Sequence, residues 1–407
     1  MPFHAFGPSV DDLALLDALR RGDDRPQGWG EPFWRTPYSF LWSALYCGGR
    51  LTPATVEGVR YLARTIAEPG FGGDDATLRY AALWFLRDVA GAALAGVDRA
   101  MASRRNEPNV RRWLAAYLRE PRSVLDWTQA DAPGEVLLAA ARTDCFDLLP
   151  DVFAAIEPLL ADPKAQVRIG AAAAASMLSR HPDLVAHRPR LLAYHLAQCD
   201  ADDPYHRASM LLGVGELDGT PRQWLRDPHP GVRICAALAP ALADDPEAIE
   251  VLLTEATRDP GFMEKYAPEG TLSLTVLPHP AAAIAERLCR HVDDIDRLLP
   301  AAIASVPHGA TYLDIGESDP TIAALCEPYL RVIFPDGLPA HSAATPTQRR
   351  LAAAVANHDP VWNRDTQALP PGDRYLASRH EHAWDATFAR LHLPNDRPAW
   401  RATANHA

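Results

Sequence analysis

One phrase of eleven residues occurs twice in the chain, and it constrains the fold more than any other feature of the sequence. Residues 162–172 read Asp-Pro-Lys-Ala-Gln-Val-Arg-Ile-Gly-Ala-Ala, and residues 227–237 read Asp-Pro-His-Pro-Gly-Val-Arg-Ile-Cys-Ala-Ala. A chain that repeats one supersecondary unit usually stacks the copies, because a single unit cannot bury its apolar face alone. The repeat therefore predicts a solenoid.

The repeated phrase has the properties of a boundary between two helices. The residue before a proline is pushed out of the α region, and proline can itself start the next helix. The Val-Arg-x-x-Ala-Ala run that follows places small side chains on one helical face, which lets neighbouring helices pack closely. The charged residues Asp162, Arg168, Asp227 and Arg233 take equivalent places. We expect them to pair within or between repeats and to satisfy polar groups at helix ends, and we call them the Asp–Arg ladder.

Weaker copies extend the repeat. Asp203-Pro204 and Asp259-Pro260 keep the Asp-Pro start, whereas Leu78-Arg79 and Val110-Arg111 keep only the apolar-Arg pair. The starts at 162, 227 and 259 are 65 and 32 residues apart, which fits an irregular array of helical hairpins of about 30 to 45 residues each. No stretch shows sustained β-alternation, so the predicted fold class is all-α.

The helices expected from apolar periodicity and from Pro, Gly and Asp breaks are separated by short connections. They cover residues 10–21, 38–47, 52–67, 74–95, 108–119, 133–142, 146–160, 164–180, 184–198, 204–217, 229–243, 246–258, 280–291, 294–305, 320–334 and 346–357.

The repeated phrase resembles the HEAT and armadillo class, and specifically short HEAT-like units whose second helix opens with Asp-Pro-x-x-x-Val-Arg-x-x-Ala-Ala. Three further segments, Thr345–Leu351, Asp359–Trp362 and Leu391–Arg397, resemble the ends of an uncharacterised group of actinobacterial HEAT-repeat proteins. The resemblance implies a right-handed α-solenoid of irregular HEAT-like helical hairpins with atypical terminal caps. It implies no activity.

The two ends of the chain differ from the repeats, so we predict three parts. Residues 1–50 form an aromatic-rich cap, residues 51–357 form the solenoid, and residues 358–407 form a second cap. A terminal repeat needs an atypical cap to cover its exposed end. The N-terminal aromatic side chains could instead line a ligand site, and they are Trp29, Phe33, Trp34, Tyr38, Phe40, Trp42 and Tyr46.

Charge and cysteine usage narrow the class of partner and compartment. The net charge of −12 disfavours a dedicated nucleic-acid binder, because phosphate binding depends on basic side chains. Residues 99–122 are an exception, with seven arginines against two glutamates, and they form either a solvated helix face or an anion-binding surface. The six cysteines form no Cys-x-x-Cys pair. The sequence also shows no long apolar run and no secretion signal. Together with the spacing of the cysteines, these features predict a cytoplasmic protein with reduced thiols.

Motifs for common chemistries are missing from the sequence. There is no Walker loop, no Gly-x-Ser-x-Gly elbow and no His-Glu-x-x-His, so no catalytic residue and no cofactor is predicted. The most metal-like cluster is His380-Glu381-His382. HEAT-like deoxyhypusine hydroxylases hold two irons with several His-Glu pairs, whereas this chain has one such pair. We therefore expect surface histidines here and predict no metal site.

The leading functional hypothesis is a non-catalytic scaffold that binds a protein or a small ligand on its concave face. Exposed arginines and aromatic side chains from the second helix of successive hairpins would supply the contacts. The candidate binding residues are Arg79, Trp84, Arg111, Trp113, Tyr205, His206 and Trp224.

The alternative hypothesis is an enzyme of HEAT-like fold that acts on DNA or on a specialised metabolite in a concave pocket. Alkylpurine DNA glycosylases of this architecture use aromatic residues, an aspartate and arginines. Trp113 with Arg111 and Arg112, or Trp224 with Arg226 and Asp227, would supply these residue types. The enzyme hypothesis predicts a deep pocket with a buried carboxylate. The acidic net charge disfavours the nucleic-acid version.

Overall fold

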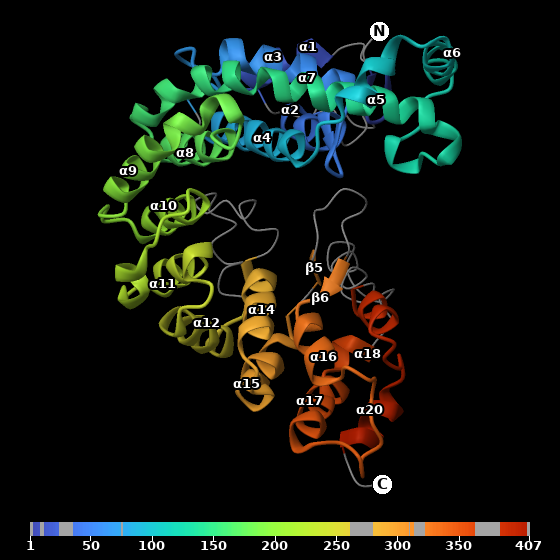
Figure 1. The fold of residues 1–407 in the computed structure, drawn as a ribbon, viewed down its shortest axis with the longest axis vertical. Coiled ribbons are helices and arrows are strands. Elements are labelled where there is room, and N and C mark those ends of the chain that lie inside the picture. Colours follow the sequence, from blue (N-terminus) through green and yellow to red (C-terminus); the bar gives the residue numbers. More distant parts are fainter. Residues whose placement is uncertain are drawn as a thin grey trace. The chain divides into compact units, whose positions relative to one another are not determined.

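The computed structural model describes residues 3–8, 12–23, 36–74, 76–260, 280–308, 310–312, 322–362 and 383–404. The described chain is mostly helical (Figure 1), which confirms the all-α prediction. It divides into two compact units. The N-terminal unit comprises Met1–Ala201 with Gly316–Ser318, and the C-terminal unit comprises Asp202–Ile315 with Asp319–Ala407. The division falls inside the region predicted to contain the repeats.

The N-terminal unit consists of α-helices joined by short turns and by 3₁₀ and π segments. Its α-helices are α1 (Asp12–Arg21), α2 (Pro37–Ser39), α3 (Pro53–Thr65), α4 (Ala76–Ala95), α5 (Arg99–Ser103), α6 (Pro108–Tyr117), α7 (Ala132–Ile156), α8 (Ala165–Leu178) and α9 (Arg188–Gln198). The π segment is η2 (Phe40–Leu45), and the 3₁₀ segments are η3 (Arg104–Asn106), η4 (Val124–Asp126), η5 (Gln129–Asp131), η6 (Glu157–Ala161) and η7 (Pro182–His187).

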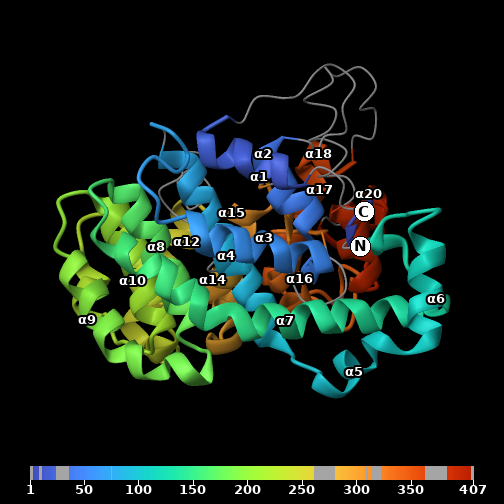
Figure 2. The ribbon, with the colours of Figure 1, turned by 90° about the horizontal axis from the view of Figure 1, so that it is seen from above.

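Small residues allow close helix packing in the N-terminal unit. Helix α4 packs against α7 and α8, and α3 packs against α7; Figure 2 shows α7 as the long helix beside them. The alanines of α8 are buried, including Ala171, Ala172 and Ala174. A Cβ atom added at Gly170 would lie 3.1 Å from side-chain atoms of both Leu83 and Tyr80. The alanine-rich half of the repeated phrase is therefore the surface on which α4 rests.

The C-terminal unit continues with helices that pack on their neighbours in sequence. Its α-helices are α10 (Pro204–Glu216), α11 (Pro230–Ala237), α12 (Pro246–Arg258), α14 (Pro280–His291), α15 (Ile295–Ser305), α16 (Glu327–Ile333), α17 (Pro346–Asn357), α18 (Asp359–Trp362), a helix at 383–390 and α20 (Arg397–Ala404), with 3₁₀ segments η8 (Arg222–Arg226) and η9 (Pro240–Leu242). Helix α10 contacts α11, α11 contacts α12, and α12 contacts α14 and α15. Helix α15 contacts α16 and α17, and α17 contacts α20.

Proline and a capping side chain start many of these helices, as the Asp-Pro phrase predicts. Asp245 caps α12 by accepting hydrogen bonds from the backbone N–H groups of Glu247 and Ala248, and Pro246 occupies the first turn. Thr345 caps α17 in the same way, with Gln348 completing a reciprocal capping box. These caps satisfy N–H groups that have no partner inside the helix.

One expected break and one expected helix differ from the structure in the middle and later parts of the chain. The helices expected at 133–142 and 146–160 form one helix, α7, because the polar residues at the expected break find partners within α7 and in η3. Thr143 donates to the Ala139 carbonyl at 2.9 Å, Asp144 pairs with Arg105 at 2.7 Å, and Cys145 is fully buried. The helix expected at 320–334 contains a short strand before α16 begins at Glu327.

The described strands form three short antiparallel pairs and no larger sheet. They are β1 (Phe3–His4) with β2 (Gly7–Pro8), β3 (Tyr46–Cys47) with β4 (Arg50–Leu51), and β5 (Ala310–Tyr312) with β6 (Ile322–Ala324). Gly48 and Gly49 join β3 to β4 with φ values of 56° and 77°. A two-residue hairpin turn requires this left-handed backbone, which glycine adopts without strain. The turn ends the helix that was expected to run through residue 47.

Candidate functional site

The first copy of the Asp–Arg ladder joins α4 to the start of α8. Asp162 forms an ion pair with Arg79 of α4 at 3.1 Å, and its other carboxylate oxygen accepts a hydrogen bond from the Lys164 N–H at 2.8 Å. Arg168 donates to the backbone carbonyls of Asp162 and Pro163 at 2.9 and 3.0 Å. The guanidinium of Arg168 thus fixes the turn, and the carboxylate of Asp162 holds the neighbouring helix.

The second copy repeats these contacts residue for residue. Asp227 forms an ion pair with Arg207 of α10 at 3.2 Å, and it accepts a hydrogen bond from the His229 N–H at 2.8 Å. Arg233 donates to the carbonyls of Asp227 and Pro228 at 2.7 and 3.0 Å. In both copies an arginine of another helix meets the aspartate, from α4 in the first and from α10 in the second, and the arginine six positions after the aspartate closes the turn.

Three of the seven candidate binding residues lie inside their unit. The Arg79 side chain is 12% exposed, and besides Asp162 it donates to the Glu68 carbonyl at 2.6 Å. Trp84 is buried on α4, with the Arg87 guanidinium 5.2 Å from its ring centroid. His206 is buried on α10. These three side chains therefore pack largely inside their own unit and do not form part of an exposed binding surface.

The other four candidates reach the surface. Arg111 is exposed and Trp113 is half-buried, both on α6, whereas Tyr205 on α10 and Trp224 in η8 are half-buried. The Tyr205 ring lies 5.9 Å from the His229 ring, which places it beside the second ladder copy. The exposed candidates of the N-terminal unit share α6, and those of the C-terminal unit lie on α10 and in η8, which both pack on α11.

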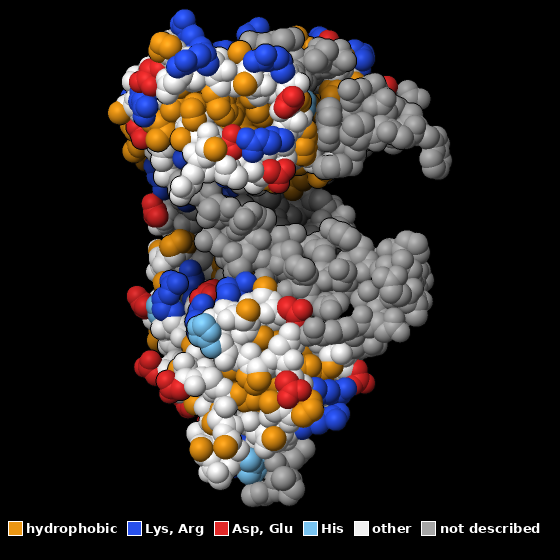
Figure 3. Space-filling model, turned by 90° about the vertical axis from the view of Figure 1, so that its right-hand side faces the viewer, with side chains coloured by type: hydrophobic (Ala, Val, Ile, Leu, Met, Phe, Trp, Pro, Cys, Tyr) orange, Lys and Arg blue, Asp and Glu red, His pale blue; other side chains and the backbone are white. Residues whose placement is uncertain are grey.

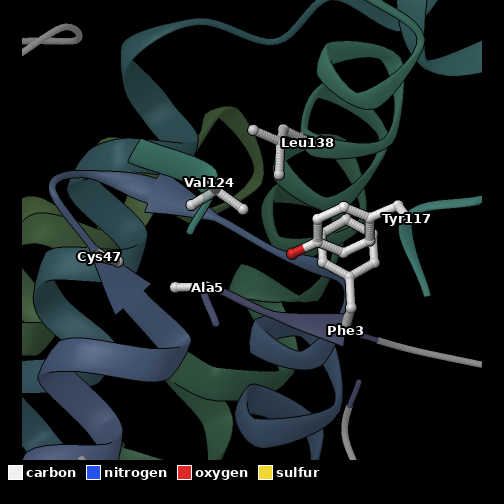
Figure 4. Packing of buried hydrophobic residues seen from close by; sticks show 6 residues of the cluster. All are labelled: Phe3, Ala5, Cys47, Tyr117, Val124 and Leu138. Carbon is white, nitrogen blue, oxygen red and sulfur yellow. The ribbon is translucent and has the colours of Figure 1, made fainter. Parts of the chain in front are cut away.

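Helix α6 is held by an aromatic cluster that sequence reasoning did not identify. Trp113 stacks on Tyr117 with ring centroids 5.1 Å apart, and both rings contact Trp127. Figure 4 shows Phe3 against Tyr117, with Val124 and Leu138 completing the packing. A Cβ atom at Gly134 would come within 2.8 Å of both tryptophans, so this glycine makes room for them.

A buried aspartate lies at the edge of this aromatic cluster. Asp131 is 2% exposed. It accepts hydrogen bonds from Trp113 Nε1 at 3.3 Å and from the Thr128 N–H at 2.8 Å, and it forms an ion pair with Arg122. Burial alone would raise the pKa of Asp131, but the donors from Thr128, Arg122 and Trp113 outweigh it and lower the pKa. Asp131 thus anchors α6 as a carboxylate.

The arginines of residues 99–122 fall into two groups. Four of them form ion pairs, and they are Arg99 with Asp147, Arg104 with Glu107, Arg105 with Asp144 and Arg122 with Asp131. The other three, Arg111, Arg112 and Arg119, are exposed and have no carboxylate partner among the described residues. Arg111 and Arg112 lie on α6 and Arg119 in the turn after its end, on either side in sequence of the exposed Ala115 and Ala116. We call these three arginines the α6 basic face.

Figure 3 looks onto the side on which Figure 1 labels α6. Lysine and arginine side chains are spread over the upper part of this view, among hydrophobic and a few acidic side chains. Positive charge is thus exposed on a chain whose net charge is negative.

The C-terminal unit contains a small pocket of about 10 Å³ between α11, α12, α14, α15 and α16, with room for about one water molecule. Its walls are mostly apolar, and its polar lining residues are Glu255, Asp259, Ser305 and Tyr329. Glu255 is 5% exposed and forms ion pairs with Arg233 of the ladder and with Arg258. In the sequence, only the weak repeat copy at Asp259-Pro260 had drawn attention to this region.

A serine–histidine pair in the N-terminal unit does not have the geometry of a nucleophilic pair. Ser176 Oγ lies 2.8 Å from His195 Nε2, but it donates its proton to the Ala172 carbonyl at 2.9 Å. The histidine must then be the donor to the serine, whereas an activating base accepts the hydroxyl proton. Both side chains are buried. The pair holds α9 against α8.

Cysteine thiols and possible metal ligands are the remaining reactive groups of the chain. None of the six cysteines forms a disulfide, and burial raises the pKa of Cys289 to about 12. Within the described ranges, no group of three or more His, Cys, Asp or Glu side chains is arranged to hold a metal ion. His380, Glu381 and His382 lie outside the described residues, as do Trp29, Phe33 and Trp34.

Comparison with models of protein families, with curated proteins and with solved structures finds no match to this chain. No single helix among the described residues combines the length and apolar composition needed to cross a membrane. Helices α4 and α5 with η3 meet that test only as a pair bent by 99°.

Proposed function

We propose that this chain is a non-catalytic scaffold that binds a partner protein, built as a right-handed α-solenoid of irregular HEAT-like hairpins. The two ladder copies support the repeat, because the same four contacts recur around Asp162 and Asp227. The packing of successive helices supports the stacking. A solenoid acts by presenting side chains of successive helices on an extended surface.

The observation that carries the proposal is the α6 basic face. Arg111, Arg112 and Arg119 are exposed without carboxylate partners among the described residues, although the chain has twelve more negative than positive charges. Four nearby arginines do pair with carboxylates, so within residues 99–122 only these three are unpaired. Guanidinium groups bind carboxylates in a two-pronged geometry. The partner we propose therefore presents an acidic segment to α6.

The aromatic cluster below α6 makes this face rigid. Trp113 and Tyr117 fix the inner side of the helix, and Asp131 ties the cluster to Arg122. A rigid binding surface loses less conformational entropy when a partner binds. In this proposal Tyr205 and Trp224 contact the partner from the C-terminal unit. Arg79, Trp84 and His206 lie inside their units and support the binding surface from there.

A photo-crosslinking experiment tests the proposal. A benzophenone amino acid replaces Ala115, which is exposed between the three arginines, in the full chain produced in its native cells. We expect one discrete crosslinked protein. The triple variant Arg111→Glu, Arg112→Glu, Arg119→Glu should lose it, because each substitution reverses a charge that faces the acidic segment.

The matched control reverses three arginines of the C-terminal unit, Arg290, Arg350 and Arg401. They are exposed, with no carboxylate partner within the described residues, so the change in net charge is the same. This control should keep the crosslinked protein. Equal loss in both variants, or no discrete product, would refute the proposal. Binding to a DNA duplex with a slope of log K against log salt of about −3, as expected for three phosphate contacts, would favour the nucleic-acid alternative instead.

A further inference from the structure

Helix α6 carries two leucines at the margin of its basic face. Each residue of an α-helix is turned by about 100° from the one before it, so residues three and four apart lie on the same side. Tyr117 is buried on the inner side of α6, whereas Arg111 and Arg112 are exposed on the outer side. At this spacing Leu114 and Leu118 fall between the two sides, next to Arg111. We call these two leucines the apolar margin.

The apolar margin is supported from below and partly open to solvent. Leu114 and Leu118 are both half-buried, and like Trp127 they pack against the buried cluster that contains Tyr117 and Val124. Figure 3 shows hydrophobic side chains gathered among lysine and arginine side chains on the side where Figure 1 labels α6. Two leucines four residues apart on one helix are neighbours, so they offer a single apolar contact next to positive charge.

Small side chains separate the arginines of the basic face. Ala115 is exposed and lies four residues after Arg111 and four before Arg119, and Leu114 precedes Leu118 by the same interval. Side chains four residues apart form rows along a helix, and the rows of a second helix fit between them when small residues allow a close approach. The spacing of both the charged and the apolar side chains therefore matches a helical partner.

We infer that the acidic segment of the partner is an amphipathic helix, whose carboxylates meet the α6 basic face while its apolar side chains cover the apolar margin. This inference rests on the proposed scaffold function and adds the chemistry of the partner. Guanidinium groups bind carboxylates in a two-pronged geometry. An anionic lipid surface would also combine negative charge with apolar groups, but the net charge of −12 repels it.

Three fluorescent peptides of about 14 residues test the inference in anisotropy titrations of the full chain. The first forms an amphipathic helix with glutamates along one side and leucines beside them. The second has serine in place of every leucine, and the third has the residues of the first in an order that spreads the leucines around the helix. We expect the first to bind at least tenfold more tightly than the others, because only it buries apolar surface while its carboxylates are paired.

The outcomes separate this inference from the scaffold proposal. Equal binding of the first and second peptides would show that the leucines add nothing, and the inference would fail while an acidic partner remained supported. No binding of the first peptide at millimolar concentration would also overturn it. The scaffold proposal itself is decided by the crosslink from position 115.

Substitutions of one leucine locate the apolar contact. Leu118→Ser should weaken binding of the first peptide severalfold and leave binding of the second unchanged, whereas Leu118→Met keeps an apolar side chain and should bind as the unaltered chain does. The matched control is Leu13→Ser, at a leucine of the same unit that is 60% exposed. Hydrogen exchange of α6 shows whether each variant keeps the helix folded. If Leu118→Ser behaves like Leu13→Ser, the partner does not cover the apolar margin and the inference is wrong.

Other occupants of this surface would give different results. Dimers of the chain that form with increasing concentration and disappear in Leu118→Ser would identify a second copy of the chain. Binding to phosphatidylserine vesicles without binding of the first peptide would identify a membrane. Either result would overturn the inference.

Discussion

The two copies of the repeated phrase make the same turn but differ in what lies beyond it. In the first copy Arg168 donates to two carbonyls and has no carboxylate partner among the described residues. In the second copy Arg233 makes the same two hydrogen bonds and then reaches Glu255, which lines the pocket. The equivalent arginine thus closes a turn in the first copy, and in the second it also holds the buried carboxylate of Glu255 on α12.

Replacing each ladder arginine by alanine tests this difference, and we expect it to produce the largest effect. Arg233→Ala leaves buried Glu255 with only the exposed Arg258, and loss of one partner of a buried ion pair costs about 3 kcal/mol. Arg168→Ala removes two hydrogen bonds at a partly exposed turn and should cost about 1 kcal/mol. Hydrogen exchange of the α11 and α8 segments measures each opening free energy separately. Equal losses of opening free energy in the two variants would mean that the ion pair between Arg233 and Glu255 adds no stability.

A second difference is the residue that follows Ile in the phrase, Gly170 in the first copy and Cys235 in the second. Gly170→Cys makes the first copy read like the second. A Cβ there would lie 3.1 Å from Leu83 and Tyr80 atoms, so we expect a loss of about 2 kcal/mol from overpacking. The control is Gly91→Cys on α4, where the nearest atom, of Met177, is 3.7 Å from the added Cβ. The control should leave hydrogen exchange of α8 unchanged, and a stable Gly170→Cys chain would show that α4 can move aside.

The smallest expected effect concerns pH, because Lys164 in the first copy corresponds to His229 in the second. Burial, with contributions from Arg207 and Arg233, lowers the pKa of His229. The unfolded histidine takes up a proton near pH 6.5, whereas the folded one does so only at lower pH. The stability that His229 contributes is therefore present above that pH and is lost as the pH falls through the lowered folded pKa.

We accordingly expect hydrogen-exchange protection of α11 to decrease between pH 7.5 and 5 more than that of α8. The variant His229→Gln should remove the excess. If the unaltered chain and the variant respond alike, the lowered pKa of His229 has no effect on the stability of this copy.

Local signals predicted much of the helical framework. Residues 246–258, 280–291 and 346–357 are helical over the expected spans, because proline and a capping residue or a break define both ends. The expected break in α7 was wrong for a non-local reason, since Asp144 is satisfied by Arg105 from a different helix. The three-part division at residues 50 and 357 stays a prediction.

The candidate sites were less accessible to sequence reasoning. Which arginines of residues 99–122 stay unpaired depends on Asp144 and Asp147 of α7, far along the chain. The pocket collects residues from Ile234 to Tyr329, and no sequence window contains them together. The enzyme alternative required a deep pocket with a buried carboxylate. Glu255 is buried beside the small pocket of the C-terminal unit, but that pocket has room for about one water molecule, and two arginines already bind the carboxylate.

The ladder also bears on the order in which the chain folds. The ion pair of the second copy joins residues 20 positions apart, whereas that of the first joins residues 83 positions apart. Closing the longer loop costs about 1 kcal/mol more in chain entropy, so Arg207 can find Asp227 before Arg79 finds Asp162. Contacts between nearby residues form fast. One sequence phrase can therefore mark an early folding step in one unit and a late one in the other.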